Sequence, residues 1–69
     1  MKISARNIIR GKVKSIIRDN VKAEVVLDIG GGAEIVSHIS VRSVDALELA
    51  EGKAAYAVIK INNVMIATP

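Results

Sequence analysis

The sequence predicts an all-β fold with one short helix, and three observations support this prediction. Much of the chain alternates apolar and polar residues with the period of two that is typical of strands. Gly, Asp and Asn residues divide this pattern into segments of strand length. Only the region from Ser40 to Leu49 changes period and places apolar residues at helical spacing.

Three strands are expected in the first part of the chain. The first runs from Asn7 to Arg18 and ends at an Asp19-Asn20 turn. The second, residues 21–29, is the clearest alternation, and Gly30-Gly31-Gly32 then reverses the chain because glycine tolerates the positive φ of tight hairpins. The third runs from about residue 33 to 39. The side chains expected on the inner face of the first strand are Ile9, Gly11, Val13, Ser15 and Ile17.

The helix is expected between Ser40 and Leu49. Ser40 or Ser43 can cap its N-terminus, since serine hydroxyls accept hydrogen bonds from the free N–H groups there. Asp45 suits a first helical turn. A turn at Glu51-Gly52 ends the helix.

Two more strands are expected near the C-terminus. The fourth, residues 53–61, is apolar on both faces, and such a strand is covered on both sides. One cover is the core, and the other is most simply a second subunit. Asn62-Asn63 reads as a turn, and Val64 to Ala67 form a short fifth strand.

This order of three strands, a helix and two strands is that of a five-stranded OB-type barrel, whose helix lies between strands three and four. An immunoglobulin-like sandwich would need more strands. Residues 1–69 are expected to form a single domain. The sequence has no Cys and one His, so disulfides and a metal cluster are excluded, and oligomerisation is the expected source of extra stability.

The apolar composition also predicts an oligomer. About half of the residues are hydrophobic, yet Tyr56 is the only aromatic one. One small core cannot bury so many aliphatic side chains, and monomers rarely expose large apolar patches. No run approaches the ~20 apolar residues of a membrane span, and the first residues lack the apolar core of a signal peptide. We therefore expect a cytoplasmic protein with no membrane partner.

The charge is uneven along the chain. The net charge is +3, and seven of the ten basic residues lie by position 22. A basic first third creates a local positive potential that attracts anions. The alternative is a solvated strand face whose lysines discourage edge pairing, and this interpretation fits most of these residues.

A tetrahedral dianion such as molybdate, tungstate or sulfate carries no proton at neutral pH, so its site needs hydrogen-bond donors only. Phosphate still carries a proton, which a donor-only site leaves unpaired at a cost of roughly 1–3 kcal/mol. Three segments supply donors with few carboxylates: Ser4-Ala5-Arg6-Asn7, Ser40-Val41-Arg42-Ser43, and Lys60 in an otherwise apolar row.

Each segment also has a simpler interpretation. The two serines of the second segment are ordinary helix caps when taken alone. Lys60 can extend past its apolar neighbours to water. Arg6 can pair with Glu24 or Glu34. The occurrence of all three segments in one small, cysteine-free chain favours a site, with Arg6 and Lys60 meeting within one copy or across a subunit boundary.

The chain resembles the Mop family of small molybdate-binding proteins, the molbindins, over nearly its whole length. The resemblance implies an OB-like fold, a hexamer built as a trimer of dimers, and molybdate or tungstate bound at subunit interfaces. It also implies side-chain ligands at Ser4, Arg6, Ser40, Ser43 and Lys60, with backbone contributions from Ala5 and Ile61. The matching segments are Ser4-Ala5-Arg6-Asn7, Gly11, Ala23-Glu24-Val25-Val26, the glycine hairpin, Ile39-Ser40, Ser43, Glu51-Gly52 and Val58-Ile59-Lys60.

Asn7, the last residue of the first motif, is a further candidate ligand. The chain departs from the family pattern at two positions. Ile61 stands where relatives often have a small or hydroxylated residue, and Ser40 stands where Thr is common. One side-chain donor is therefore missing, which affects the expected affinity and not the expected place of the site.

The sequence thus predicts a non-enzymatic oxyanion binder that stores or buffers molybdate, with no cofactor and no direct coordination of the metal by protein atoms. Two alternatives remain at this point: an OB-fold nucleic-acid module, and an oligomerisation or sensor module of a molybdate-responsive transporter or regulator. The near absence of aromatic residues weighs against single-strand binding, which relies on stacking. His38 has no motif that places a nucleophile beside it, so catalysis is not expected.

Overall fold

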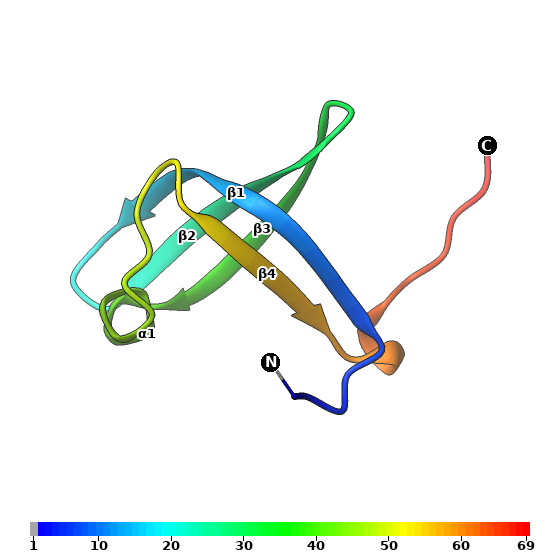
Figure 1. Ribbon diagram of the computed structural model, residues 1–69, viewed down its shortest axis with the longest axis horizontal. Coiled ribbons are helices and arrows are strands. Elements are labelled where there is room, and N and C mark those ends of the chain that lie inside the picture. The colour runs from blue at the N-terminus through cyan, green and yellow to red at the C-terminus, as the bar shows by residue number, and fades with distance from the viewer. Residues whose placement is uncertain (1) are drawn as a thin grey trace.

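The computed structural model describes residues 2–69 and shows a mostly β chain with one short α-helix (Figure 1). Four antiparallel strands form one sheet in the order β3-β2-β1-β4. The elements are β1 (Asn7–Arg18), β2 (Lys22–Gly30), β3 (Ala33–Ser40), α1 (Val41–Ala46), β4 (Ala54–Ile59) and the 3-10 turn η1 (Ile61–Asn63).

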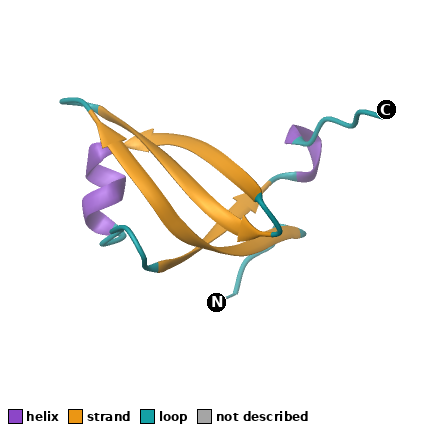
Figure 2. Ribbon diagram, turned by 90° about the horizontal axis from the view of Figure 1, so that it is seen from above, coloured by secondary structure: helices purple, strands orange, loops and turns teal. Residues whose placement is uncertain are grey.

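The strand β1 holds the sheet together because it pairs with a different neighbour in each half. Its first half pairs with β4, from Asn7 opposite Ile59 to Lys12 opposite Ala54. From Lys12 to Arg18 it pairs with β2. The sheet curls strongly as a result and forms a half-barrel, which is seen from above in Figure 2.

The core lies inside this curl, and α1 covers one end of it (Figures 1 and 2). The only α1 residue in the buried cluster is Val44, which is 1% exposed. The other buried side chains come from β1 and β2. They are Val13, Ala23, Val25 and Leu27.

Glycines permit two tight features of the sheet. Gly31 and Gly32 form the two-residue turn between β2 and β3. Their φ angles are 62° and 81°, and residues other than glycine rarely adopt such positive values. Gly11 lies in β1 against β2. A Cβ atom at this position would lie 2.8 Å from the backbone oxygen of Asp28, so only glycine allows the strands to approach this closely.

A β-bulge at Lys14 corrects one prediction. The register passes from Val13 opposite Leu27 to Ser15 opposite Val26, which leaves Lys14 unpaired. A one-residue slip exchanges the two faces of a strand. Ile16 therefore packs against the core, whereas Ile17, which was expected inside, is 65% exposed.

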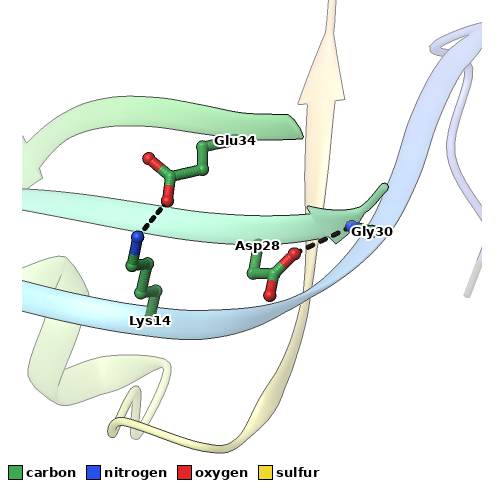
Figure 3. Close-up of polar contacts among 4 residues, drawn as sticks. All are labelled: Lys14, Asp28, Gly30 and Glu34. Carbon is green, nitrogen blue, oxygen red and sulfur yellow. Dashed lines mark hydrogen bonds and ion pairs between the residues drawn. The ribbon is translucent and has the colours of Figure 1, made fainter. Parts of the chain in front are cut away.

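The bulged residue Lys14 forms an ion pair with Glu34, and its side chain crosses β2 to reach β3 (Figure 3). The hydrogen bond to Glu34 and its negative charge raise the pKa of Lys14. Glu24 contacts His38 instead, with the carboxylate oxygen 3.1 Å from Nε2. Both carboxylates that the sequence offered to Arg6 are thus engaged elsewhere.

The described chain forms a half-barrel of four strands, so the fifth strand of the predicted OB-like barrel is not confirmed. Within residues 2–69, Val64 to Ala67 pair with no strand, because η1 turns the chain away after β4 (Figure 1). The helix is also shorter than expected. It ends at Ala46, so Asp45 lies beyond the first turn and instead accepts a hydrogen bond from Arg18 at 3.3 Å. None of the described helices has the length and apolar run that a bilayer crossing requires.

Asp19 makes the turn between β1 and β2 sensitive to pH. Its carboxylate accepts hydrogen bonds from the backbone N–H groups of Val21 and Lys22, both at 2.7 Å, and these bonds hold its pKa below the ordinary value of 3.8. A lowered folded-state pKa means that the ionised carboxylate stabilises the fold above the unfolded pKa. This stabilisation is lost as the pH falls through the folded pKa.

We therefore expect Asp19→Ala to reduce the free energy of unfolding at pH 7 and to reduce it much less at pH 2 to 3. Urea unfolding of both proteins at several pH values and one protein concentration measures the difference. A difference that stays constant from pH 7 to pH 2 contradicts this account of the turn.

Candidate functional site

The first predicted donor segment and Lys60 line one hollow of about 640 Å³. Asn7 pairs with Ile59, so the residues that precede β1 and those that follow β4 meet at the same end of the sheet. The register of two strands thus brings together segments more than fifty residues apart. The hollow is lined by Ile3, Ser4, Ala5, Arg6, Val58, Lys60, Ile61 and Asn62.

The chemistry of this hollow suits an anion. It contains two cationic side chains, Arg6 and Lys60, and the hydroxyl of Ser4. Neither cation forms an ion pair with any residue between 2 and 69, so both are available to a ligand. No carboxylate is among the described residues that line it. An acceptor-only ligand would meet donors and positive charge here, with no repelling group.

The structure therefore gathers five of the eight predicted site residues in one place. Asn7 is not among the residues that line the hollow; it begins β1 and is half-buried. Asn62 was missed, because its sequence context suggests only a turn. Its amide adds another possible donor beside Ile61, the position where the expected hydroxyl is lacking.

Ser40 and Ser43 lie at the start of α1, where Ser40 acts as the N-cap. Its Oγ accepts the Ser43 backbone N–H at 3.0 Å, and the two hydroxyl oxygens are 2.9 Å apart. The capping interpretation is thus confirmed for Ser40. The cap does not use all the hydrogen-bonding capacity of the two serines, since each hydroxyl oxygen has two lone pairs and one proton.

The two donor groups are far apart within one copy. Ser40 pairs with Lys22 at the start of β2, next to the C-terminal end of β1, whereas the hollow lies at the N-terminal end of β1 (Figure 1). The twelve residues of β1 separate them, at about 3.3 Å per residue along the strand. One chain cannot place both groups on a single small ion.

Lys22 is a cation that the sequence argument did not assign to the site. It lies directly opposite Ser40, and opposed residues of an antiparallel pair point to the same face. Within residues 2–69 it has no ion pair. Its position depends on the β2–β3 register, which shifts by one residue between Asp28 and Gly30, and spacing alone does not reveal this shift.

Comparison with known families now identifies the fold. The model of the TOBE domain matches residues 3–66, which is nearly the whole chain. The chain belongs to the TOBE-domain family. This TOBE domain is similar to a probable molybdenum-pterin-binding protein of Haemophilus influenzae, with 52% identity over 66 residues that cover 96% of each chain. It is 50% identical to molybdenum-pterin-binding protein 1 of Clostridium pasteurianum, covering 96% of this chain and 97% of that one.

Solved structures agree with the fold. MopII from Clostridium pasteurianum in an apo form is 48% identical with a TM-score of 0.90, covering 97% of this TOBE domain and 100% of that chain. The cytoplasmic molybdate-binding protein ModG, with molybdate bound, is 45% identical with a TM-score of 0.92. The match covers this chain completely and 49% of ModG. The resemblance to Mop proteins and the mostly β fold with one short helix are thus confirmed.

The cap at Ser40 leads to a prediction about stability. Ser40→Ala removes the hydroxyl that accepts the Ser43 N–H, and we expect a loss of about 1 kcal/mol in the free energy of unfolding. Ser40→Gly should cost only a few tenths of that, since glycine is tolerated at this position. Ser43→Ala is the matched control, because it keeps the capping bond. Chemical denaturation showing equal losses for Ser40→Ala and Ser43→Ala would exclude the cap as the source.

Proposed function

We propose that this protein binds molybdate or tungstate, as fully deprotonated tetrahedral dianions, between neighbouring copies of the chain. It then serves as a store or buffer of the oxyanion in the cytoplasm and catalyses no reaction. The support is chemical and comparative. Among residues 2–69, the hollow presents two unpaired cations and a hydroxyl, and no carboxylate lines it. Similar proteins carry names that state binding of molybdate or of molybdenum-pterin.

The separation of the two donor groups is the observation that carries this proposal. Arg6 and Lys60 lie at one end of β1, and Ser40 and Ser43 lie near the other. If both groups contact the same ion, they must come from different copies. A homo-oligomer is therefore part of the function, and a hexamer built as a trimer of dimers provides repeated junctions of this kind.

The ion would be held as a ligand through its oxygens. In this arrangement Arg6 and Lys60 supply charge, Ser4, Ser40 and Ser43 supply hydroxyl donors, and Ala5 and Ile61 supply backbone N–H groups. No protein atom needs to contact the metal at the centre of the tetrahedron, so neither a metal-coordinating residue nor a cofactor is required. Residues 1–69 act together as one Mop domain.

A cytoplasmic location fits this role, and the similar ModG is described as cytoplasmic. A sensor role is the second candidate. The molybdenum transport protein ModE of Herbaspirillum seropedicae is 42% identical over 94% of this chain, which is 24% of that longer protein. A nucleic-acid role is less favoured, because ion pairs occupy Lys14 and Arg18 of the basic first third and Tyr56 is the only aromatic residue.

Isothermal titration calorimetry with molybdate tests the proposal. We expect saturable binding to the unsubstituted protein, and weaker binding of phosphate at neutral pH because of its proton. Lys60→Gln should weaken molybdate binding by on the order of 10- to 100-fold, since a hydrogen bond to a charged group contributes about 1.5–3 kcal/mol.

Lys12→Gln is the matched control for this experiment. It makes the same change of charge on the outer face of β1, away from the hollow. Its affinity should stay close to that of the unsubstituted protein. The proposal fails if the unsubstituted protein gives no heat with molybdate at micromolar concentration, or if both variants lose affinity equally.

A further inference from the structure

Glu24 and His38 contact each other on the solvent-exposed face of the sheet. They lie directly opposite on β2 and β3, with the Glu24 carboxylate oxygen 3.1 Å from Nε2 of His38. The side chains of His38 and Glu24 are 70% and 41% exposed, so water and protons reach both groups. The contact is an ion pair only when the imidazole is protonated, because a neutral imidazole leaves the carboxylate without an opposite charge.

The register of the sheet places this pair beside the serine group of the proposed site. Ser40 follows His38 by two residues on β3, and Lys22 precedes Glu24 by two residues on β2. Ser40 and Lys22 also lie opposite each other. Residues two apart on a strand share a face and lie about 7 Å apart. The Glu24–His38 pair is therefore the next row of the sheet face after the row that carries the Ser40 hydroxyl.

Other charged groups lie around the pair. The hollow of about 270 Å³ that the pair lines is also lined by Lys22, and by Arg18 and Asp19 where β1 ends. Arg18 pairs with Asp45, and Asp19 accepts hydrogen bonds from the backbone of its turn. Lys22 has no ion pair within residues 2–69. Of the residue types around this hollow, only histidine ordinarily changes its charge between pH 5 and 8.

Protonation of His38 changes the charge that a nearby anion meets. When the imidazole is protonated, its positive charge cancels that of the Glu24 carboxylate. When the proton leaves, one negative charge remains beside the serines. A separation of about 7 Å is shorter than the Debye length of about 8 Å at physiological ionic strength, so salt screens this charge only in part. The lone carboxylate therefore repels a dianion held by Ser40 and Ser43.

We propose that the Glu24–His38 pair makes oxyanion binding depend on pH, with tighter binding when His38 is protonated and easier release as the pH rises. The inference rests on the proposed function, because it requires an ion in contact with Ser40 and Ser43. It assigns a regulating pair to the serine side of the site. Coupling between two bound species is reciprocal, so the bound dianion also favours the protonated imidazole, and the protein takes up protons as it binds the ion.

Calorimetry with molybdate at pH 6 and pH 8 tests this coupling, because molybdate stays a dianion at both values. We expect the unsubstituted protein to bind about 2- to 5-fold more weakly at pH 8, and the difference to shrink with added salt. His38→Gln should bind with the same, weaker affinity at both pH values. Glu24→Gln should bind more tightly than the unsubstituted protein at pH 8, since it removes the repelling charge.

Glu34→Gln is the matched control for the carboxylate. It makes the same change of charge on β3, but six residues from Ser40 along the strand, and it should change the affinity much less. Calorimetry in two buffers with different ionisation enthalpies adds a second readout, the number of protons taken up on binding. This uptake should be measurable at pH 7 in the unsubstituted protein and absent in His38→Gln.

The outcomes separate this inference from the proposed function. Molybdate binding that is equally tight at pH 6 and pH 8 overturns the inference alone, and so does a pH dependence that His38→Gln retains. Equal gains in affinity for Glu24→Gln and Glu34→Gln also overturn it, because they show an effect of net charge and not of position. The absence of molybdate binding at both pH values overturns the proposed function and this inference together.

Discussion

The long strand β1 is the constraint on which the structure and its proposed use depend. It pairs with β4 through one half and with β2 through the other, and this shared pairing curls the sheet. The same length holds the two donor groups apart. Hydrogen bonds reach only about 3 Å, so a rigid strand of twelve residues prevents one copy from closing on a small ion. The proposed site therefore requires donors from two copies.

Ion pairs engage two of the basic side chains among the described residues. Lys14 pairs with Glu34 across β2, and Arg18 pairs with Asp45 on α1. Exposed pairs of this kind contribute little to stability. Their larger effect is on the distribution of charge, because they consume carboxylates near the middle and the far end of the sheet. Arg6 and Lys60 are left without partners in the described chain, in a hollow that no carboxylate lines.

The local pattern of the sequence was sufficient for most of the fold. Alternation and turn residues placed β1 with its observed bounds and β2, β3 and β4 within about two residues, and a serine cap placed the start of α1. The bulge at Lys14 could not be predicted, because it depends on the pairing of β1 with β2 and not on β1 alone. Residues 64–67 show a different limit of sequence-based prediction. Their strand pattern was recognised, yet the described chain offers no strand that pairs with them.

The candidate site was predictable in composition and not in arrangement. Ser4, Arg6 and Lys60 stand out as donors in sequence, but their convergence depends on the β1–β4 register. Their separation from Ser40 follows from the β1–β2 and β2–β3 pairings, which spacing along the chain does not show. Lys22 was overlooked for the same reason, since its position opposite Ser40 comes from the β2–β3 pairing.

Complementation between two defective variants tests the split site most directly. One carries Lys60→Gln, and the other carries Ser40→Gly with Ser43→Ala. Each alone should bind molybdate weakly. In an equimolar mixture refolded together, about a quarter of the junctions between copies combine an intact Lys60 with an intact serine pair, if copies assemble at random. A site divided between copies predicts that the mixture regains that fraction of full-affinity sites in calorimetry. A mixture that binds no better than the average of its two parents would contradict it.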